Sequence, residues 1–225
     1  MKLDLLWRES GVSESHLAEV RYNAWNKNDN LTLEEAFYLC DSLRESFDLP
    51  PLSQAAMCAA DILADIPWAF CGGTAINKLI EPRTTKDVDI LTLDRSNAMS
   101  KLLQSKLFRA EGNKLKHTSG GEIDIINWES GNLHCPKETA KRALATASTQ
   151  RMWGKNVPMV SPAGVIAMKL GRATTTKPKA RQDQEDILAV LRKYGYQNLS
   201  KYHLTQAMLA EYKKLADEVK NIQQD

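Results

Sequence analysis

Residues 68–93 read WAFCGGTAINKLIEPRTTKDVDILTL, and this stretch decides the fold. Its first four residues are apolar and stop at Gly72 and Gly73, which predicts a buried strand ending in a tight turn. Residues 74–80 have the apolar spacing of a helix, and residues 85–93 alternate in character as a second strand does. A strand, a glycine turn, a helix and a second strand in this order predict an α/β or α+β core.

The second predicted strand carries two acids, Asp87 and Asp89. Side chains at positions i and i+2 of a strand point to the same face, so both carboxylates project together. Two carboxylates held this close repel each other unless a cation neutralises them, and Mg²⁺ takes oxygen ligands that it shares with substrate phosphates. A third acid, Asp124, lies in the apolar run 122–126, where a charge is costly. If that run is a strand beside residues 85–93, the three carboxylates converge.

Each of these signals is unspecific by itself. A glycine pair between a strand and a helix is more often a structural turn than a phosphate site, and acidic pairs are common on protein surfaces. Glycines at this point nevertheless allow a phosphate to approach the backbone N–H groups at a helix N-terminus. The specific feature is the order along the chain: Gly72-Gly73-Thr74, Arg83-Thr84-Thr85, Asp87-Val88-Asp89, and then Asp124.

This order resembles the polymerase-β-like nucleotidyltransferase superfamily. The resemblance implies that the glycine turn holds a nucleoside triphosphate, and that Mg²⁺ or Mn²⁺ binds the three acids, the third of which assists the attacking hydroxyl. The reaction implied is in-line attack on the α-phosphate with pyrophosphate leaving. The residues implied are Asp87, Asp89 and Asp124 as catalytic and metal-binding groups, and Gly72, Gly73 and Thr74 as nucleotide-binding groups.

The C-terminal half extends the resemblance to the AbiEii-type branch, whose members include toxins of toxin–antitoxin systems. Lys169 falls on one expected helix, and Arg181 and Asp183 fall on the next. The resemblance implies that these three residues line the nucleotide site, with Arg181 the looser match. Snorkelling of Lys169 among apolar neighbours and an ordinary surface role for Arg181 are the alternative explanations. The resemblance covers about residues 67–195.

The chain of 225 residues divides into three expected regions. Residues 1–66 form an acidic helical N-terminal region, residues 67–150 the nucleotidyltransferase α/β core, and residues 151–225 a C-terminal helical region. The expected fold class is therefore α+β, with a small mixed β-sheet flanked by helical parts. Residues 1–66 carry 5 basic and 12 acidic side chains, whereas the remainder carries 25 and 16. A basic body can hold phosphates or nucleic acid, although charge also varies along any solvated surface.

Helical periodicity and the remaining composition complete the expectations. Further helices are expected from residue 161 onward and over residues 53–64, 97–108, 181–194 and 204–222. No apolar run approaches the roughly 20 residues that span a bilayer, and the first residues do not read as a signal peptide. We therefore expect a cytoplasmic protein without membrane contact. The four cysteines and four histidines are too scattered to indicate a zinc site or a disulfide framework.

The expected function is metal-dependent transfer of a nucleoside monophosphate from a nucleoside triphosphate to an unidentified acceptor. Candidate acceptors are an RNA such as tRNA, a protein or a small molecule, and the basic loop with Lys177 and Lys179 would suit RNA phosphates. Family analogy adds a toxin role, with an antitoxin protein as partner. The alternative is a catalytically inactive nucleotide-binding or regulatory module of the same fold. A DxD-type glycosyltransferase or phosphatase fits less well, because the glycine turn would have no role in a phosphatase.

Overall fold

The structure of the chain is a computed structural model that describes residues 50–80, 85–127, 134–152 and 155–222. Within these residues the chain forms seven helices and one seven-stranded sheet. The helices expected in the first 49 residues, and the motif residues Arg83 and Thr84, lie outside the described part. The expected α+β class with a mixed sheet is confirmed.

The sheet has the strand order β3-β4-β5-β2-β1-β7-β6. β2 lies at its centre, antiparallel to β1 and parallel to β5, and β1 is also parallel to β7. The strand expected over residues 122–126 therefore does lie beside the acid-bearing strand. The strands are β1 (Trp68–Phe70), β2 (Val88–Thr92), β3 (Phe108–Glu111), β4 (Lys114–His117), β5 (Glu122–Ile126), β6 (Ser148–Met152) and β7 (Lys155–Met159).

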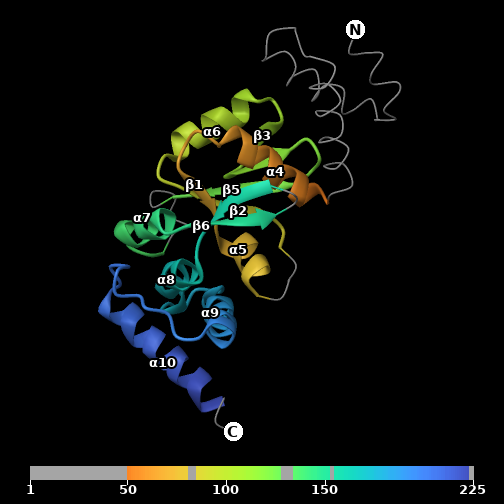
Figure 1. Cartoon of the computed structure of the whole chain (residues 1–225). Helices are drawn as coiled ribbons and strands as arrows, with labels where there is room; N and C mark the ends of the chain where they lie inside the picture. The colour runs from red at the N-terminus through yellow and green to blue at the C-terminus, as the bar shows by residue number, and fades with distance from the viewer. Residues whose placement is uncertain (1–49, 81–84, 128–133, 153–154, 223–225) are drawn as a thin grey trace, which may run out of the picture.

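Helices cover both faces of the sheet, as Figure 1 shows. α4 and α6 pack together on one face, α5 and α7 lie on the other, and α8 and α9 pack beyond them with α10 outermost. The helices are α4 (Pro51–Ile62), α5 (Gly72–Leu79), α6 (Arg95–Gln104), α7 (Lys137–Ala145), α8 (Pro162–Ala173), α9 (Ala180–Tyr194) and α10 (Gln206–Ile222). None of the described helices is both long and apolar enough to cross a membrane.

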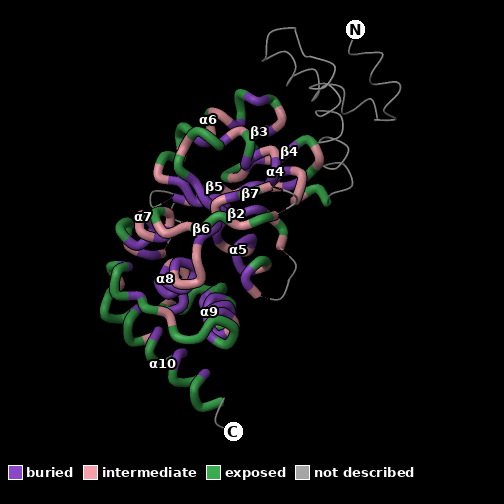
Figure 2. The backbone as a smooth tube through the Cα atoms, in the orientation of Figure 1, coloured by how far each residue is buried: buried purple, intermediate pink, exposed green. Residues whose placement is uncertain are grey.

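The hydrophobic core surrounds the central strands, which are buried in Figure 2. Ile90 and Leu91 of β2, with Ile123 and Ile125 of β5, are each at most 1% exposed. Burying side chains of this size stabilises the fold by about 1.5–3 kcal/mol each, so the two acid-bearing strands are held rigidly together. The alanine-rich face of α4 packs against β5 and β2 in the same core, although α4 falls within the expected N-terminal region.

Several helix ends follow local signals in the sequence. The Ser161 side chain accepts a hydrogen bond from the Gly164 N–H at 3.3 Å and caps α8, whose first residue is a proline. α9 ends before Gly195, which has a φ of +70°. The helix expected over residues 97–108 ends earlier, at Gln104, because the chain turns at Lys106 (φ +59°) and continues into β3.

Candidate active site

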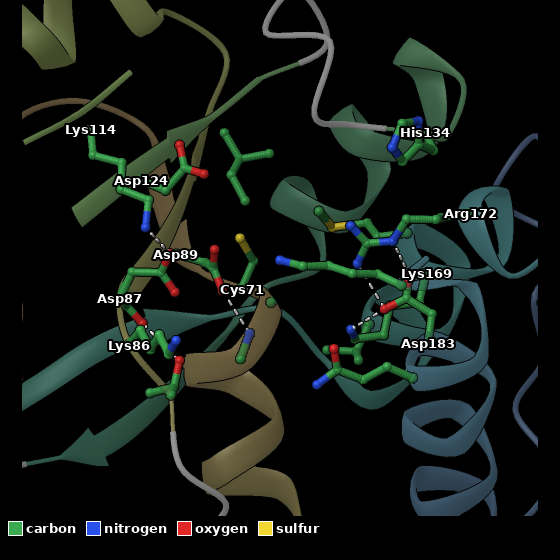
Figure 3. A pocket seen from close by; sticks show the side chains of 18 residues that line it. Cys71, Lys86, Asp87, Asp89, Lys114, Asp124, His134, Lys169, Arg172 and Asp183 are labelled. Carbon is green, nitrogen blue, oxygen red and sulfur yellow. Dashed lines mark hydrogen bonds and ion pairs between the residues drawn. The ribbon is translucent and has the colours of Figure 1, made fainter. Parts of the chain in front are cut away.

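Three acids meet at one edge of the two central strands. In the parallel register of β2 and β5, Asp89 is the direct partner of Asp124, and Asp87 immediately precedes β2. All three line a cavity of about 580 Å³, together with Gly72 and Gly73. The convergence expected from the sequence is therefore present, and Figure 3 shows these acids on one side of the cavity.

The glycine turn at the start of α5 holds Asp89 in place. The Gly73 N–H donates a hydrogen bond of 2.7 Å to Oδ2 of Asp89, and the Asp89 N–H donates to Oγ1 of Thr74 at 3.2 Å. Gly72 has a φ of +49°, and a Cβ atom there would lie 2.2 Å from the same Oδ2. Glycine is required at this position both for backbone conformation and for room. The Thr74 hydroxyl is buried and is directed at β2 rather than at the cavity.

Burial of the acids makes their negative charges costly. Burial raises the pKa of Asp89 to about 6, and the charges of Asp87 and Asp124 raise it as well. The hydrogen bond from Gly73 opposes this rise. Burial raises the pKa of Asp124 in the same way, and the charge of Asp87 raises it further. The positive charges of Lys114, Arg95 and Lys179 act in the opposite direction. A bound cation would relieve this repulsion, so the acids at this edge favour cationic ligands.

The chemistry of these donors fits a hard divalent cation, because all three offer carboxylate oxygens that face one cavity. Among the described residues, no three Asp, Glu, His or Cys side chains already surround one point as the ligands of an ion. Oδ2 of Asp87 forms an ion pair with Nζ of Lys114 at 2.6 Å. Asp87, Asp89 and Asp124 are the residues that would hold the ion.

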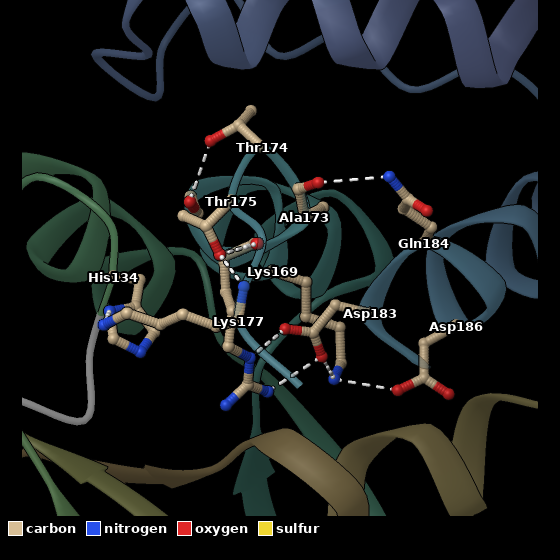
Figure 4. A network of polar contacts seen from close by, with 11 residues as sticks. His134, Lys169, Ala173, Thr174, Thr175, Lys177, Asp183, Gln184 and Asp186 are labelled. Carbon is tan, nitrogen blue, oxygen red and sulfur yellow. Dashed lines mark hydrogen bonds and ion pairs between the residues drawn. The ribbon is translucent and has the colours of Figure 1, made fainter. Parts of the chain in front are cut away.

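A pair of cations on α8 faces the acids across the cavity. Nζ of Lys169 lies 2.7 Å from Asp183 Oδ1 and 2.8 Å from Asp186 Oδ2, and the Arg172 guanidinium forms a two-point ion pair with Asp183. Figure 4 shows this network between α8 and α9. The charge of Lys169 also partly offsets the rise in the pKa of Asp89, so the lysine stabilises carboxylates on both sides of the cavity.

Asp183 is the anchor of this network. It is 1% exposed, and although burial alone would raise its pKa, the ion pairs with Arg172 and Lys169 lower it below its ordinary value. In return, the hydrogen bond to Asp183 raises the pKa of Arg172. A buried carboxylate that is already paired twice is better placed to orient the two cations than to contact a negatively charged nucleotide.

The sequence-predicted residues do not all reach the cavity. Lys169 and Asp183 line it, whereas Arg181 does not. The Arg181 side chain is 88% exposed and pairs with Glu185 one helical turn away. The position of Arg181 is therefore that of an ordinary surface residue, which was the alternative explanation for it.

Sequence reasoning missed two cations of the site. Arg172 lies three residues after Lys169 on α8, which places both on one helix face, so the i, i+3 spacing was a usable signal. Lys114 comes from β4, a strand that the sequence did not predict. Other polar residues that line the cavity are Thr85, Lys86, His134, Lys179 and Gln182.

Comparisons with known proteins agree with the motif order. Residues 55–124 match the family model described as the nucleotidyl transferase AbiEii toxin of a type IV toxin–antitoxin system. No curated protein sequence matches the chain. The matched segment contains the glycine turn and ends at Asp124, so it spans all three acids. The resemblance expected from the sequence is thereby confirmed over these residues, whereas its extension to Lys169, Arg181 and Asp183 stays a prediction.

One solved structure shares the fold. A crystal structure of an antigenic nucleotidyltransferase-like protein from Paracoccidioides brasiliensis superposes with a TM-score of 0.56 at 20% identity, covering 77% of this chain and 91% of that one. The antibiotic-resistance factor ANT(2")-Ia, crystallised in complex with adenylyl-2"-tobramycin, gives a TM-score of 0.41 at 14% identity, covering 73% of this chain and 92% of that one. Only the first likeness is close enough to show the fold.

Proposed function

We propose that this chain, a nucleotidyltransferase of the AbiEii type, moves a nucleoside monophosphate from a nucleoside triphosphate to a hydroxyl-bearing acceptor in a reaction that depends on a divalent metal. The observation that carries the proposal is the division of one cavity into two walls. Three carboxylates form one wall, and the Lys169–Arg172 pair stands on the other. Phosphoryl transfer needs both: a place for a metal ion and cations for the phosphates.

The cationic wall would bind the triphosphate. The phosphate oxygens lie against Lys169 and Arg172, which Asp183 holds in fixed orientations, and Lys179 adds charge at the cavity rim. Asp87, Asp89 and Asp124 would hold Mg²⁺ or Mn²⁺. When bound, such an ion neutralises charge that develops on the α-phosphate and on the leaving pyrophosphate.

Asp124 is placed to accept the proton of the acceptor hydroxyl. Its pKa is raised by burial and by Asp87, which brings it closer to the value that suits a general base at neutral pH. The hydroxyl oxygen forms a bond to the α-phosphorus, and the bond from that phosphorus to the bridging oxygen of the β-phosphate breaks. The nucleoside monophosphate is then attached to the acceptor, and pyrophosphate leaves towards Lys169 and Arg172.

The test is transfer from radiolabelled nucleoside triphosphates, with Mg²⁺ or Mn²⁺, to tRNA, other RNA, proteins and small hydroxyl compounds. We expect one triphosphate to label one acceptor class, and Asp89→Asn to abolish the labelling. Absence of transfer from every triphosphate to every acceptor, by natively folded protein, would contradict the proposal. Metal-dependent nucleotide binding in that case would favour the inactive binding module instead.

The toxin role, with an antitoxin protein as partner, is part of the proposal and rests on the family match to residues 55–124. Expression in a bacterial host tests it directly. We expect growth arrest with the natural chain and normal growth with Asp87→Ala, because the arrest would require the transfer reaction. Equal growth of both strains at equal protein levels would separate this chain from a toxin while leaving the transferase proposal intact.

A further inference from the structure

Lys114 of β4 lines the cavity, and the proposed reaction gives it no role. Its Nζ lies 2.6 Å from Asp87 Oδ2 and 3.1 Å from Glu122 Oε2. The lysine lines the cavity, and its side chain is 34% exposed, so the ion pair lies at the cavity wall and not on the open surface. Figure 3 shows Lys114 directed at Asp87.

The ammonium group pairs with one of the two carboxylate oxygens that Asp87 could offer to a metal ion. Oδ2 of Asp87 points at Lys114, and the same positive charge lowers the pKa of Asp124. A divalent ion entering among the three acids would meet this charge at short range and would have to displace it from Asp87. Coulomb repulsion between a divalent ion and an ammonium group about 6 Å away weakens binding by about tenfold in a water-like medium.

Glu122 supplies a second carboxylate to which Lys114 can move. It is the Cα partner of Lys116 across the β4–β5 pair, and its carboxylate already accepts a hydrogen bond from Lys114. The ammonium can therefore leave Asp87 and still keep its ion pair with Glu122. Besides the observed position on Asp87 and Glu122 together, a position on Glu122 alone is therefore open to Lys114.

We propose that Lys114 couples metal uptake to nucleotide uptake: it restrains Asp87 so that a bare divalent cation binds weakly, and the ion enters as its complex with the triphosphate. This proposal rests on the proposed function. The triphosphate brings its own anionic oxygens to the ion and gains contacts with Lys169 and Arg172, and these gains offset the displacement of Lys114 from Asp87. Lys114 is then a positioning residue that acts through Asp87.

Direct measurement of Mn²⁺ binding to the full-length protein tests this coupling. Free Mn²⁺ is followed by electron paramagnetic resonance, with and without a non-hydrolysable nucleoside triphosphate analogue. We expect the natural protein to bind Mn²⁺ weakly alone and much more tightly with the analogue. Lys114→Met should bind Mn²⁺ alone about tenfold more tightly, and its gain from the analogue should shrink accordingly.

Lys116→Met is the matched control. It removes one positive charge from the same strand, but Lys116 pairs with Glu111 at 3.6 Å and does not line the cavity. It should change Mn²⁺ affinity by less than about twofold, since its charge is further from the acids and better screened. Glu122→Gln is a second variant that leaves Lys114 on Asp87, and it should weaken Mn²⁺ uptake with the analogue.

The outcomes separate the two proposals. Mn²⁺ affinity of Lys114→Met equal to or below that of the natural protein would overturn the role of Lys114, as would equal affinity of the natural protein with and without the analogue. In both cases bound Mn²⁺ would still support the proposed function. If neither the natural protein nor any variant binds Mn²⁺ even with the analogue, the metal-dependent function itself fails.

Discussion

The backbone N–H of Gly73 and the Oδ2 atom of Asp89, sixteen residues apart in the chain, are joined by a hydrogen bond of 2.7 Å. The glycine turn was expected to present its N–H groups to a phosphate. The Gly73 N–H instead fixes one oxygen of a partly buried carboxylate. The turn therefore acts on the proposed chemistry by positioning Asp89.

Gly72→Ala should disrupt this arrangement. The new Cβ would lie 2.2 Å from Oδ2 of Asp89, so the carboxylate must move, and a displacement near 1 Å can lower a rate about 100-fold. Initial rates of nucleotide transfer measure the effect. Gly112→Ala is the control, because Gly112 also has a positive φ (+60°) but open space around it. It should cost about 1–2 kcal/mol in stability and leave the rate unchanged.

Asp89→Asn should stabilise the protein while it removes activity. The folded-state pKa of about 6 lies above the reference value of 3.8, so ionised Asp89 destabilises the fold by up to about 3 kcal/mol at neutral pH. Urea unfolding at pH 7.5 should show a higher free energy of unfolding for the variant, and the difference should shrink near pH 4. The transfer rate should fall by about 1,000-fold.

Asp183→Asn should have the opposite effect on stability. The pKa of Asp183 is lowered in the folded state, so its ionised form stabilises the protein above the unfolded pKa, and this stability is lost as the pH falls. Removing the charge leaves Arg172 without its carboxylate partner and costs about 3 kcal/mol at pH 7.5. An unfolding free energy equal to that of the natural protein would contradict the role of Asp183 as an anchor.

The transfer rate should decline in acid. As the pH falls through about 6, Asp89 takes up a proton and ceases to be a metal ligand. We expect the initial rate at limiting triphosphate and metal concentrations, which reports the free protein, to fall by about tenfold per pH unit below this point. Protein stability should rise over part of the same range, because the raised pKa makes the ionised form the less stable one. A rate that declines only together with unfolding would refute this account.

Arg172 and Arg181 provide a test of which arginine serves the nucleotide. Arg172 lines the cavity and is held by Asp183, whereas Arg181 is exposed on α9. Arg172→Met should weaken binding of a triphosphate analogue by about 10- to 100-fold, as expected for charge-assisted hydrogen bonds. Arg181→Met should change it by less than twofold. Isothermal titration calorimetry on both variants gives the comparison.

The elements with local signals were predictable from sequence. β5 has the expected bounds, because its Ile-Asp-Ile-Ile run follows a glycine pair, and α8 begins at its Ser161–Pro162 cap. β3, β4, β6 and β7 were not predicted. Their sequences are short and largely polar, as in FRAE and STQRM, and their identity as strands depends on pairing with distant partners.

The candidate site divides in the same way. The acids could be inferred because the i, i+2 spacing of Asp87 and Asp89 and the apolar surroundings of Asp124 are visible in the sequence. Which cation pairs with which acid could not be inferred from the sequence. Arg172 depends on Asp183 across the α8–α9 contact, and Lys114 reaches Asp87 across β5. The three-region division at residues 66 and 150 stays a prediction.

The two walls of the cavity come from separate stretches of the gene. The carboxylates are encoded within residues 87–124, and the paired cations with their anchor within residues 169–183. Substitutions in α8 and α9 can therefore alter the cations of the cavity while the three carboxylates stay unchanged. An exchange of this later stretch alone would replace the paired cations together with their anchor and keep the carboxylate triad intact.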